Sequence, residues 1–184
     1  MIADRGFMAG SRRISDAALR HLYLIALGSN MRVPGIGGPR RVLGAAGTAL
    51  EQHGLTITAT APVIETAPIG PSSRCYANGA VLAESTLAPP DLLALLQAVE
   101  RSFGRDRDQR RGARWRARAL DLDIILWSGG IWDATHLSIP HTLFRTREFV
   151  LQPASAIARH WHDPLSGLTV GQLHARLRKP RKTR

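Results

Sequence analysis

The sequence predicts an α+β sandwich, in which helices cover a sheet whose strands pair mainly in the antiparallel sense. Segments with helical apolar spacing alternate with short strand-like segments, and this order fits strands that pair around intervening helices. The chain has no G-x-x-x-x-G-K-[ST] run and no G-x-G-x-x-G after a strand. These absences argue against a P-loop enzyme and against a Rossmann site.

Four strands and four helices are predicted in order along the chain. Period-two alternation or a continuous apolar run predicts strands at 22–27, 55–60, 76–86 and 120–127, and the second pattern continues towards residue 66. Apolar residues at helical spacing predict helices at 39–53, 89–103, 147–158 and 169–178. Turn formers at 67–73 and arginines at 105–117 predict loops, and Gly28-Ser29-Asn30 is expected to end the first strand.

Composition bounds the class of protein and its partners. The chain has 184 residues, 44% of them apolar, which suits one domain of ordinary size at 21–178. We expect a flexible extension at 1–20 and a basic tail at 179–184. The net charge of +11 implies acidic partners such as nucleic acid, a membrane surface or a phosphate-rich small molecule. The single cysteine fits a reducing compartment and no apolar run approaches the length of a membrane span, so we expect a cytoplasmic protein. We also expect a monomer.

Asp121 and Asp123 are the strongest candidates for chemistry. Side chains two residues apart in a strand point to the same face, and two carboxylates there repel unless a cation lies between them. Their neighbours Leu120, Leu122 and Ile124 are apolar, so we expect a central strand with little water on its other face. One Mg²⁺ ion, or two about 3.5–4 Å apart, would resolve the repulsion. A structural cluster neutralised by arginine is an equal alternative on this motif alone.

An arginine-rich loop precedes these aspartates. Eight arginines lie between residues 101 and 118, and only Asp106 and Asp108 lie among them, so internal pairing cannot neutralise all eight. The planar guanidinium donors suit phosphate oxygens. A solvated basic loop or a nucleic-acid patch is the alternative, but Trp115 is the only aromatic residue in the loop, which disfavours nucleic acid. His141 after Pro140 could contact phosphate, although a lone histidine is more often structural.

In this order the motifs resemble the family of 6-hydroxymethyl-7,8-dihydropterin pyrophosphokinases of folate biosynthesis. The resemblance spans nearly all of residues 22–175, and no single motif is decisive. It is carried by Tyr23–Asn30, Thr66-Ala67-Pro68-Ile69-Gly70, Tyr76-Ala77-Asn78, Glu100 with Gly104-Arg105, Arg118-Ala119-Leu120-Asp121-Leu122-Asp123, Ile139-Pro140-His141 and Arg147-Glu148-Phe149.

The resemblance implies a ferredoxin-like α-β-α sandwich that transfers pyrophosphate from ATP to the hydroxymethyl group of the pterin and releases AMP. It implies two Mg²⁺ ions held by Asp121 and Asp123, with Arg105 and Arg118 at the transferred group. It also implies ATP contacts from Gln97, Glu100, Arg107, Trp115, Ile124, Ser138, His141 and Arg147, and pterin contacts from Thr66, Ile69, Tyr76, Asn78 and Phe149. Trp115 and Phe149 would close the ring site.

Departures from the family bear on nucleotide affinity more than on reaction type. The segment between Arg107 and Trp115 is about two residues longer than is common, and Arg116-Ala117 stands where Gly-Pro is frequent. An RNA-binding protein and a catalytically silent ATP-binding relative are the competing hypotheses. Steep salt dependence of RNA binding would indicate the first. Nucleotide binding without product would indicate the second.

Overall fold

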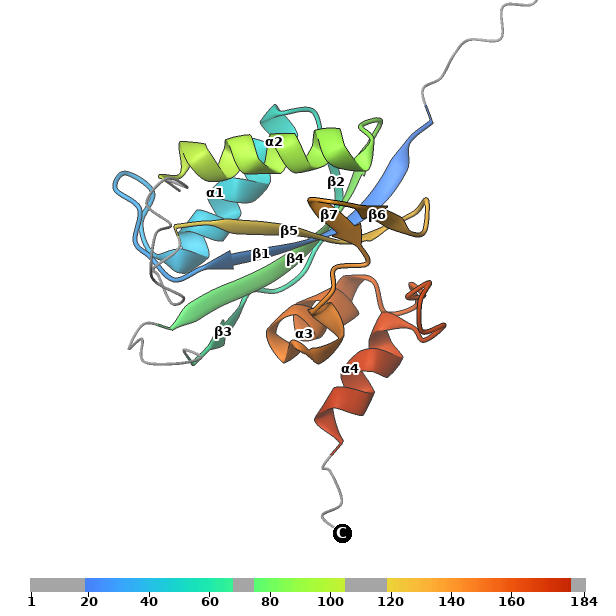
Figure 1. Cartoon of the computed structure of the whole chain (residues 1–184). Coiled ribbons are helices and arrows are strands. Elements are labelled where there is room, and N and C mark those ends of the chain that lie inside the picture. The colour runs from blue at the N-terminus through green and yellow to red at the C-terminus, as the bar shows by residue number, and fades with distance from the viewer. Residues whose placement is uncertain (1–18, 68–74, 105–118, 180–184) are drawn as a thin grey trace, which may run out of the picture.

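The computed structural model describes residues 19–67, 75–104 and 119–179, and its centre is an antiparallel sheet (Figure 1). The main path of the sheet runs β2 (Thr56–Thr60), β4 (Tyr76–Ser85), β1 (His21–Ser29), β5 (Asp121–Trp127), and β3 (Ile64–Thr66) pairs with the beginning of β4. Every one of these pairings is antiparallel. The α+β class predicted from the sequence is confirmed.

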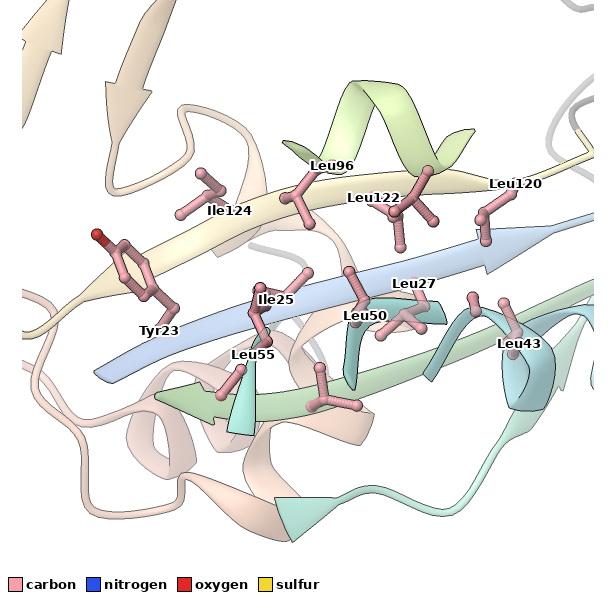
Figure 2. Packing of buried hydrophobic residues seen from close by; sticks show 14 of the residues in the cluster. Tyr23, Ile25, Leu27, Leu43, Leu50, Leu55, Leu96, Leu120, Leu122 and Ile124 are labelled. Carbon is pink, nitrogen blue, oxygen red and sulfur yellow. The ribbon is translucent and has the colours of Figure 1, made fainter. Parts of the chain in front are cut away.

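Two helices cover one face of the sheet. They are α1 (Pro39–Gln52) and α2 (Pro89–Ser102), and each begins with a proline, whose missing N–H costs nothing in the first turn. Figure 2 shows their apolar stripes meeting the sheet, with Leu43, Leu50 and Leu96 against Ile25 and Leu27. Burial of each such side chain stabilises the fold by about 1.5–3 kcal/mol. This layer is the larger of two apolar clusters.

The opposite face of the sheet carries a second helical layer. There α3 (Glu148–Ile157) packs on the sheet, and α4 (Val170–Arg178) packs against α3 (Figure 1). A capping box begins α4, because the Thr169 hydroxyl accepts the Gln172 N–H while the Gln172 side chain accepts the Thr169 N–H. The two layers together make the predicted sandwich.

Strand β5 differs from the prediction, because among the described strands it lies at the end of the main sheet rather than in its centre. Its apolar run reflects burial on both faces. Leu122 and Ile124 join the cluster beneath α1 and α2, whereas Ile125 and Leu126 join the cluster beneath α3. A β-bulge puts the consecutive residues Ile125 and Leu126 on one face: Ile25 pairs with Ile124 and Leu24 pairs with Leu126, so Ile125 is the extra residue.

Smaller elements differ from the prediction as well. The segment expected as one strand is divided into β2 and β3, and β1 runs through Gly28 to Ser29 instead of ending at Leu27. The short hairpin of β6 (Trp132–Ala134) and β7 (Leu137–Ile139) was not predicted. It leads through Pro140 and His141 to the 3₁₀ turn η2 (Phe144–Thr146). No helix in the described part of the chain is long and apolar enough to cross a membrane.

Candidate active site

The strand register brings Asn78 and Asp121 to the two sides of one glycine. Gly28 on β1 pairs with Asn78 on β4 and with Asp121 on β5, so all three share a face of the sheet. A Cβ atom placed on Gly28 would lie 3.8 Å from Asn78 Oδ1 and 3.9 Å from Asp121 Cβ. The amide and the carboxylate therefore look across a residue that has no side chain of its own.

The next row of the sheet repeats this arrangement with alanines. Ala26 pairs with Ala80 on one side and with Asp123 on the other, on the face that α3 covers. Asp121 and Asp123 thus share a face, as the sequence predicted, and both are partly buried. Because Gly28, Ala26 and Ala80 rise little above the sheet, the polar side chains of β4 and β5 border a low apolar floor. Of these three, Gly28 is half-buried, whereas Ala26 and Ala80 are 8% and 1% exposed within the second apolar cluster, so the accessible part of the floor is the Gly28 row.

A hydrogen bond sets the orientation of the Asn78 amide. Asn78 Nδ2 donates to Thr66 Oγ1 at 2.8 Å, and the register of β3 against β4 places Tyr76 opposite Thr66. Oδ1 then points towards Gly28. The amide keeps acceptor capacity over the floor and a second N–H for a ligand edge. Thr66, Tyr76 and Asn78, predicted together as pterin contacts, lie together in the structure.

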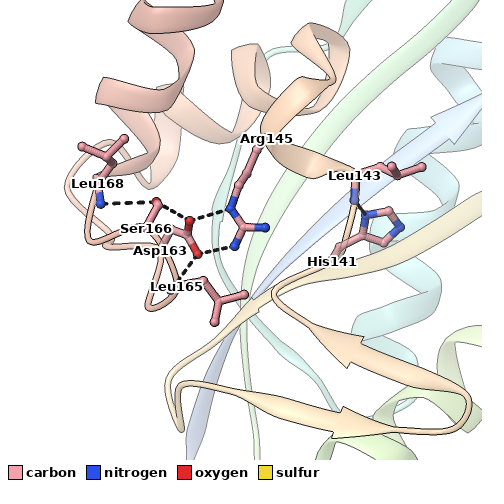
Figure 3. Close-up of polar contacts among 7 residues, drawn as sticks. All are labelled: His141, Leu143, Arg145, Asp163, Leu165, Ser166 and Leu168. Atoms are coloured by element: carbon pink, nitrogen blue, oxygen red, sulfur yellow. Dashed lines mark hydrogen bonds and ion pairs between the residues drawn. The ribbon is translucent and has the colours of Figure 1, made fainter.

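His141 is held beside the aspartates through its backbone and its ring. Its N–H donates to the carbonyl of Ile125, the bulge residue of β5, at 3.1 Å. Its ring Nδ1 accepts the N–H of Leu143 at 3.2 Å (Figure 3). In the neutral ring the proton is therefore on Nε2, which can donate to a ligand.

Several groups act on the charge state of His141. Burial lowers its pKa most strongly; Asp123 and Asp121 raise it, and Arg147 lowers it. The net direction is downward from the ordinary value, so the ring is neutral near pH 7. The same interactions show that His141, Arg147 and both aspartates lie within electrostatic reach of one another.

Arg147 stands at the N-cap of α3, at the positive end of that helix. Its guanidinium carbon lies 5.8 Å from the centroid of the Phe149 ring, close enough for a cation–π contact. Phe149 is partly buried and packs against the second apolar cluster. A cation and a ring predicted to serve different substrates are therefore neighbours on α3.

Glu100 reaches the same strand from the opposite face. It is 2% exposed on α2, and its Oε1 accepts the N–H of Leu122, the residue between the two aspartates, at 2.9 Å. Ser29 Oγ donates to the carbonyl of Ala119 at 2.6 Å, just before β5 begins. Both bonds hold the start of the strand that carries the carboxylates, and neither was foreseen from the sequence. The signal for Glu100 in the sequence is a carboxylate beside Val99 on the helix that precedes the strand.

The other predicted contacts are spread around this centre. Gln97 is partly buried on α2 one turn before Glu100, and the side chain of Ile124 is buried in the first cluster. Ser138 on β7 donates to Asp133 Oδ1 at 3.1 Å within the hairpin. The remaining predicted residues lie outside the described part of the chain; they are Ile69, Arg105, Arg107, Trp115 and Arg118.

The donor set at the aspartates fits magnesium in kind. Carboxylate oxygens are the ligands that Mg²⁺ prefers, and it takes the rest of its shell from water and substrate phosphates instead of an all-protein cage. Residues 19–67, 75–104 and 119–179 contain no group of three or more His, Cys, Asp or Glu side chains arranged to hold a metal. Two carboxylates on one face are the protein's share of such a site.

Comparison with known proteins identifies the family of the chain. The family model described as 7,8-dihydro-6-hydroxymethylpterin-pyrophosphokinase (HPPK) matches residues 24–159, well over half of the chain. A relative from Pseudomonas aeruginosa, named 2-amino-4-hydroxy-6-hydroxymethyldihydropteridine pyrophosphokinase, is 38% identical over 136 residues, which cover 73% of this chain and 78% of the relative. The Bacillus subtilis protein of the same name is 34% identical over 143 residues, or 77% of this chain and 80% of the relative.

Two further matches cover less of the matched protein. A relative of the same name from Synechocystis is 42% identical over 104 residues, and the match spans 56% of this chain and 51% of that relative. A crystal structure of Plasmodium falciparum HPPK-DHPS has a TM-score of 0.62 and 14% identity, and the match covers 88% of this chain and 42% of that one. The structural match shows the fold alone. Taken with the length and identity of the bacterial matches, the family model shows that this chain belongs to the 7,8-dihydro-6-hydroxymethylpterin-pyrophosphokinase family.

Proposed function

We propose that the chain transfers the pyrophosphoryl group of ATP to the hydroxymethyl group of 6-hydroxymethyl-7,8-dihydropterin and releases AMP, as a step in folate biosynthesis. Membership of the family supports an ATP-dependent pyrophosphokinase. The observation that carries the proposal is the row Asn78–Gly28–Asp121, because it sets an amide suited to a pterin edge across one glycine from a carboxylate suited to a metal.

The pterin end of the site is the Thr66–Asn78 pair. A pterin is flat and carries an amide-like edge, and the free capacity of the Asn78 amide can both accept and donate to such an edge. Tyr76 and Phe149 are partly buried and offer ring faces for stacking. Gly28, half-buried and without a side chain, leaves space for part of the ring system. Ile69 completes the predicted set from outside the described residues.

The phosphate end of the site is made by Asp121, Asp123, His141 and Arg147. Asp121 and Asp123 would hold magnesium, and we assign two ions to them. When bound, the metal neutralises phosphate charge and aligns the entering and leaving oxygens. His141 Nε2–H and the Arg147 guanidinium can each donate a hydrogen bond to phosphate oxygens. Because the His141 ring is neutral, it leaves no buried charge unpaired when phosphate is absent.

The reaction balances as a displacement at the β-phosphorus of ATP. The pterin hydroxyl oxygen forms the new bond to that phosphorus, the bond to the bridging oxygen of the α-phosphate breaks, and AMP leaves with the bridging oxygen. The hydroxyl proton is lost to the surroundings of the site, and no residue is assigned as its base. Positioning and charge neutralisation then carry most of the rate, as in other phosphoryl-type transfers.

A product assay tests this proposal. Purified protein is incubated with Mg²⁺, ATP and hydroxymethyl-dihydropterin, and nucleotides are separated and quantified. We expect AMP and the pterin diphosphate in equal amounts. ADP as the product, or no product at saturating Mg²⁺, contradicts the proposal. Arg105, Arg107, Arg118 and Trp115 stay predicted contacts to ATP, and a monomeric state and a cytoplasmic location also stay predictions.

A further inference from the structure

The loop of residues 141–147 connects two predicted phosphate contacts, His141 at its start and Arg147 at its end. Its only regular element is the three-residue turn η2. Inside the loop, the N–H of Phe144 donates to the carbonyl of His141 at 3.2 Å, and the N–H of Arg147 donates to the carbonyl of Phe144 at 3.3 Å. Thr146 adds two bonds, because its N–H and its hydroxyl donate to the carbonyl of Leu143 at 3.2 and 3.0 Å. These bonds shape the turn itself, and its placement against the rest of the protein needs outside support.

Arg145, in the middle of this loop, receives that support from Asp163. Arg145 Nε donates to Asp163 Oδ2 at 2.7 Å and its Nη2 donates to Oδ1 at 2.6 Å, a two-pronged ion pair (Figure 3). The Asp163 side chain is 0% exposed. The guanidinium also lies over the ring of Phe144, which is fully buried, at 4.7 Å from its centroid. Arg145 is thus fixed on two sides.

Asp163 is itself set rigidly in the loop between α3 and α4. Its carboxylate also accepts the hydroxyl of Ser166 and the N–H of Leu165 (Figure 3). Its own N–H donates to the carbonyl of Leu168 at 2.9 Å, and its carbonyl accepts the N–H of Gly167 at 2.9 Å. Burial alone would raise the pKa of the carboxyl, but these donors, with Arg145 first, outweigh it and lower the pKa. The carboxylate is therefore charged and immobile.

Asp163 lies beyond residue 159, where the match to the family model ends. The ring of His141 lies apart from the ion pair of Arg145 and Asp163, beside Leu143 (Figure 3). We propose that Asp163 is a positioning residue for the nucleotide: through Arg145 it fixes the loop 141–147 so that His141 and Arg147 face Asp121 and Asp123. The inference rests on the proposed function for its role in ATP binding.

The kinetic test compares Asp163→Asn, Arg145→Met and the double variant with the wild type in the AMP assay. Displacing a phosphate contact by about 1 Å costs on the order of a hundredfold in rate, so we expect at least a tenfold loss in kcat/KM for ATP. The KM for the pterin should rise less than the KM for ATP, because Thr66 and Asn78 lie on other strands and Phe149 alone of the described pterin contacts lies beside the loop. The double variant loses no more than either single variant, since both break one interaction.

Arg178→Met is the matched control. Arg178 on α4 forms an ion pair with Glu148 on α3 at 3.8 Å, but both side chains are more than half exposed, at 68% and 56%. Such an exposed pair contributes little to stability, so its loss leaves both KM values unchanged. If Asp163→Asn lowers only the melting temperature, with the KM for ATP as in the wild type, Asp163 merely stabilises the fold and the proposal is overturned.

A second readout needs no substrate. The N–H of Leu143, bound to His141 Nδ1, reports the shape of the loop, and its hydrogen exchange can be followed by NMR in the unliganded protein. We expect faster exchange at Leu143 in Asp163→Asn, with exchange in β1 and β4 unaltered. Unchanged exchange at Leu143 overturns the proposal. If the wild type makes no AMP, the proposed function fails, and the exchange experiment still decides whether Asp163 positions the loop.

Discussion

Replacing Gly28 by alanine tests the site at the point where its two halves meet. The new methyl group would lie 3.8 Å from Asn78 Oδ1 and 3.9 Å from Asp121 Cβ, which are ordinary contact distances. The backbone of Gly28 is not in the left-handed region, so alanine is tolerated there. Glycine inside a strand costs about 0.5–1 kcal/mol relative to alanine, and the variant should be as stable as the wild type or slightly more stable.

Activity should move in the opposite direction from stability. The methyl group occupies the floor between the amide and the carboxylate, where we place the reacting part of the pterin. Shifting a reactant by about 1 Å costs roughly a hundredfold, so kcat/KM for the pterin should fall by about that factor. Thermal unfolding and the AMP assay measure the two quantities on the same sample.

Gly79→Ala is the matched control for this experiment. Gly79 follows Asn78 on β4 and faces the other side of the sheet, where an added Cβ would meet Leu43 and Val63 at 3.6 and 3.9 Å. The same methyl group there should leave kcat/KM within about twofold of the wild type, since it contacts only the apolar layer. Full activity in Gly28→Ala would refute the placement of substrate over the floor.

Three further predictions follow from the site and its support. Asp121→Ala should lower the turnover rate by roughly a thousandfold or more, while the circular dichroism spectrum stays that of the wild type. Retained activity would contradict the assignment of a metal site to Asp121. Thr66→Val removes the acceptor for Asn78 Nδ2 and should raise the KM for the pterin by roughly three- to tenfold with the KM for ATP unchanged. Arg145 and its neighbours lower the pKa of Asp163 below its ordinary value of 3.8, so the ionised carboxylate stabilises the fold above that pH. In unfolding experiments the free energy of unfolding should fall as the pH falls through the lowered pKa. The fall should be smaller in Asp163→Asn, which lacks the carboxylate.

Much of the fold could be predicted because its signals are local. The apolar stripe of α2 spans 14 residues, enough to distinguish a helix from a strand. The hairpin β6–β7 was missed because each strand has three residues, too few to show a period. The place of β5 at the end of the sheet was missed because a strand buried on both faces has the same apolar run as a central one.

The site was predictable where chemistry repeats along the sequence and not where it depends on distant partners. The spacing of Asp121 and Asp123 alone predicts that they share a face of the strand. The contact of Glu100 with Leu122 and the ion pair of Arg145 with Asp163 join residues 22 and 18 positions apart, and no local pattern marks either pair. The tertiary fold determines which hydrogen-bond donor each buried carboxylate contacts.

The extra residue in β5 ties the two ends of the phosphate site together. Ile125 has no partner in the described register with β1, and its carbonyl is the one that accepts the N–H of His141. The strand therefore behaves as two short strands offset by one position, the first carrying the aspartates and the second anchoring the chain that returns with His141. Deleting Ile125 would leave Leu126 and Trp127 paired with Leu24 and Tyr23 on their present faces, but it would remove the carbonyl that holds the N–H of His141. A single inserted residue thus joins the metal-binding strand to the loop that meets the nucleotide.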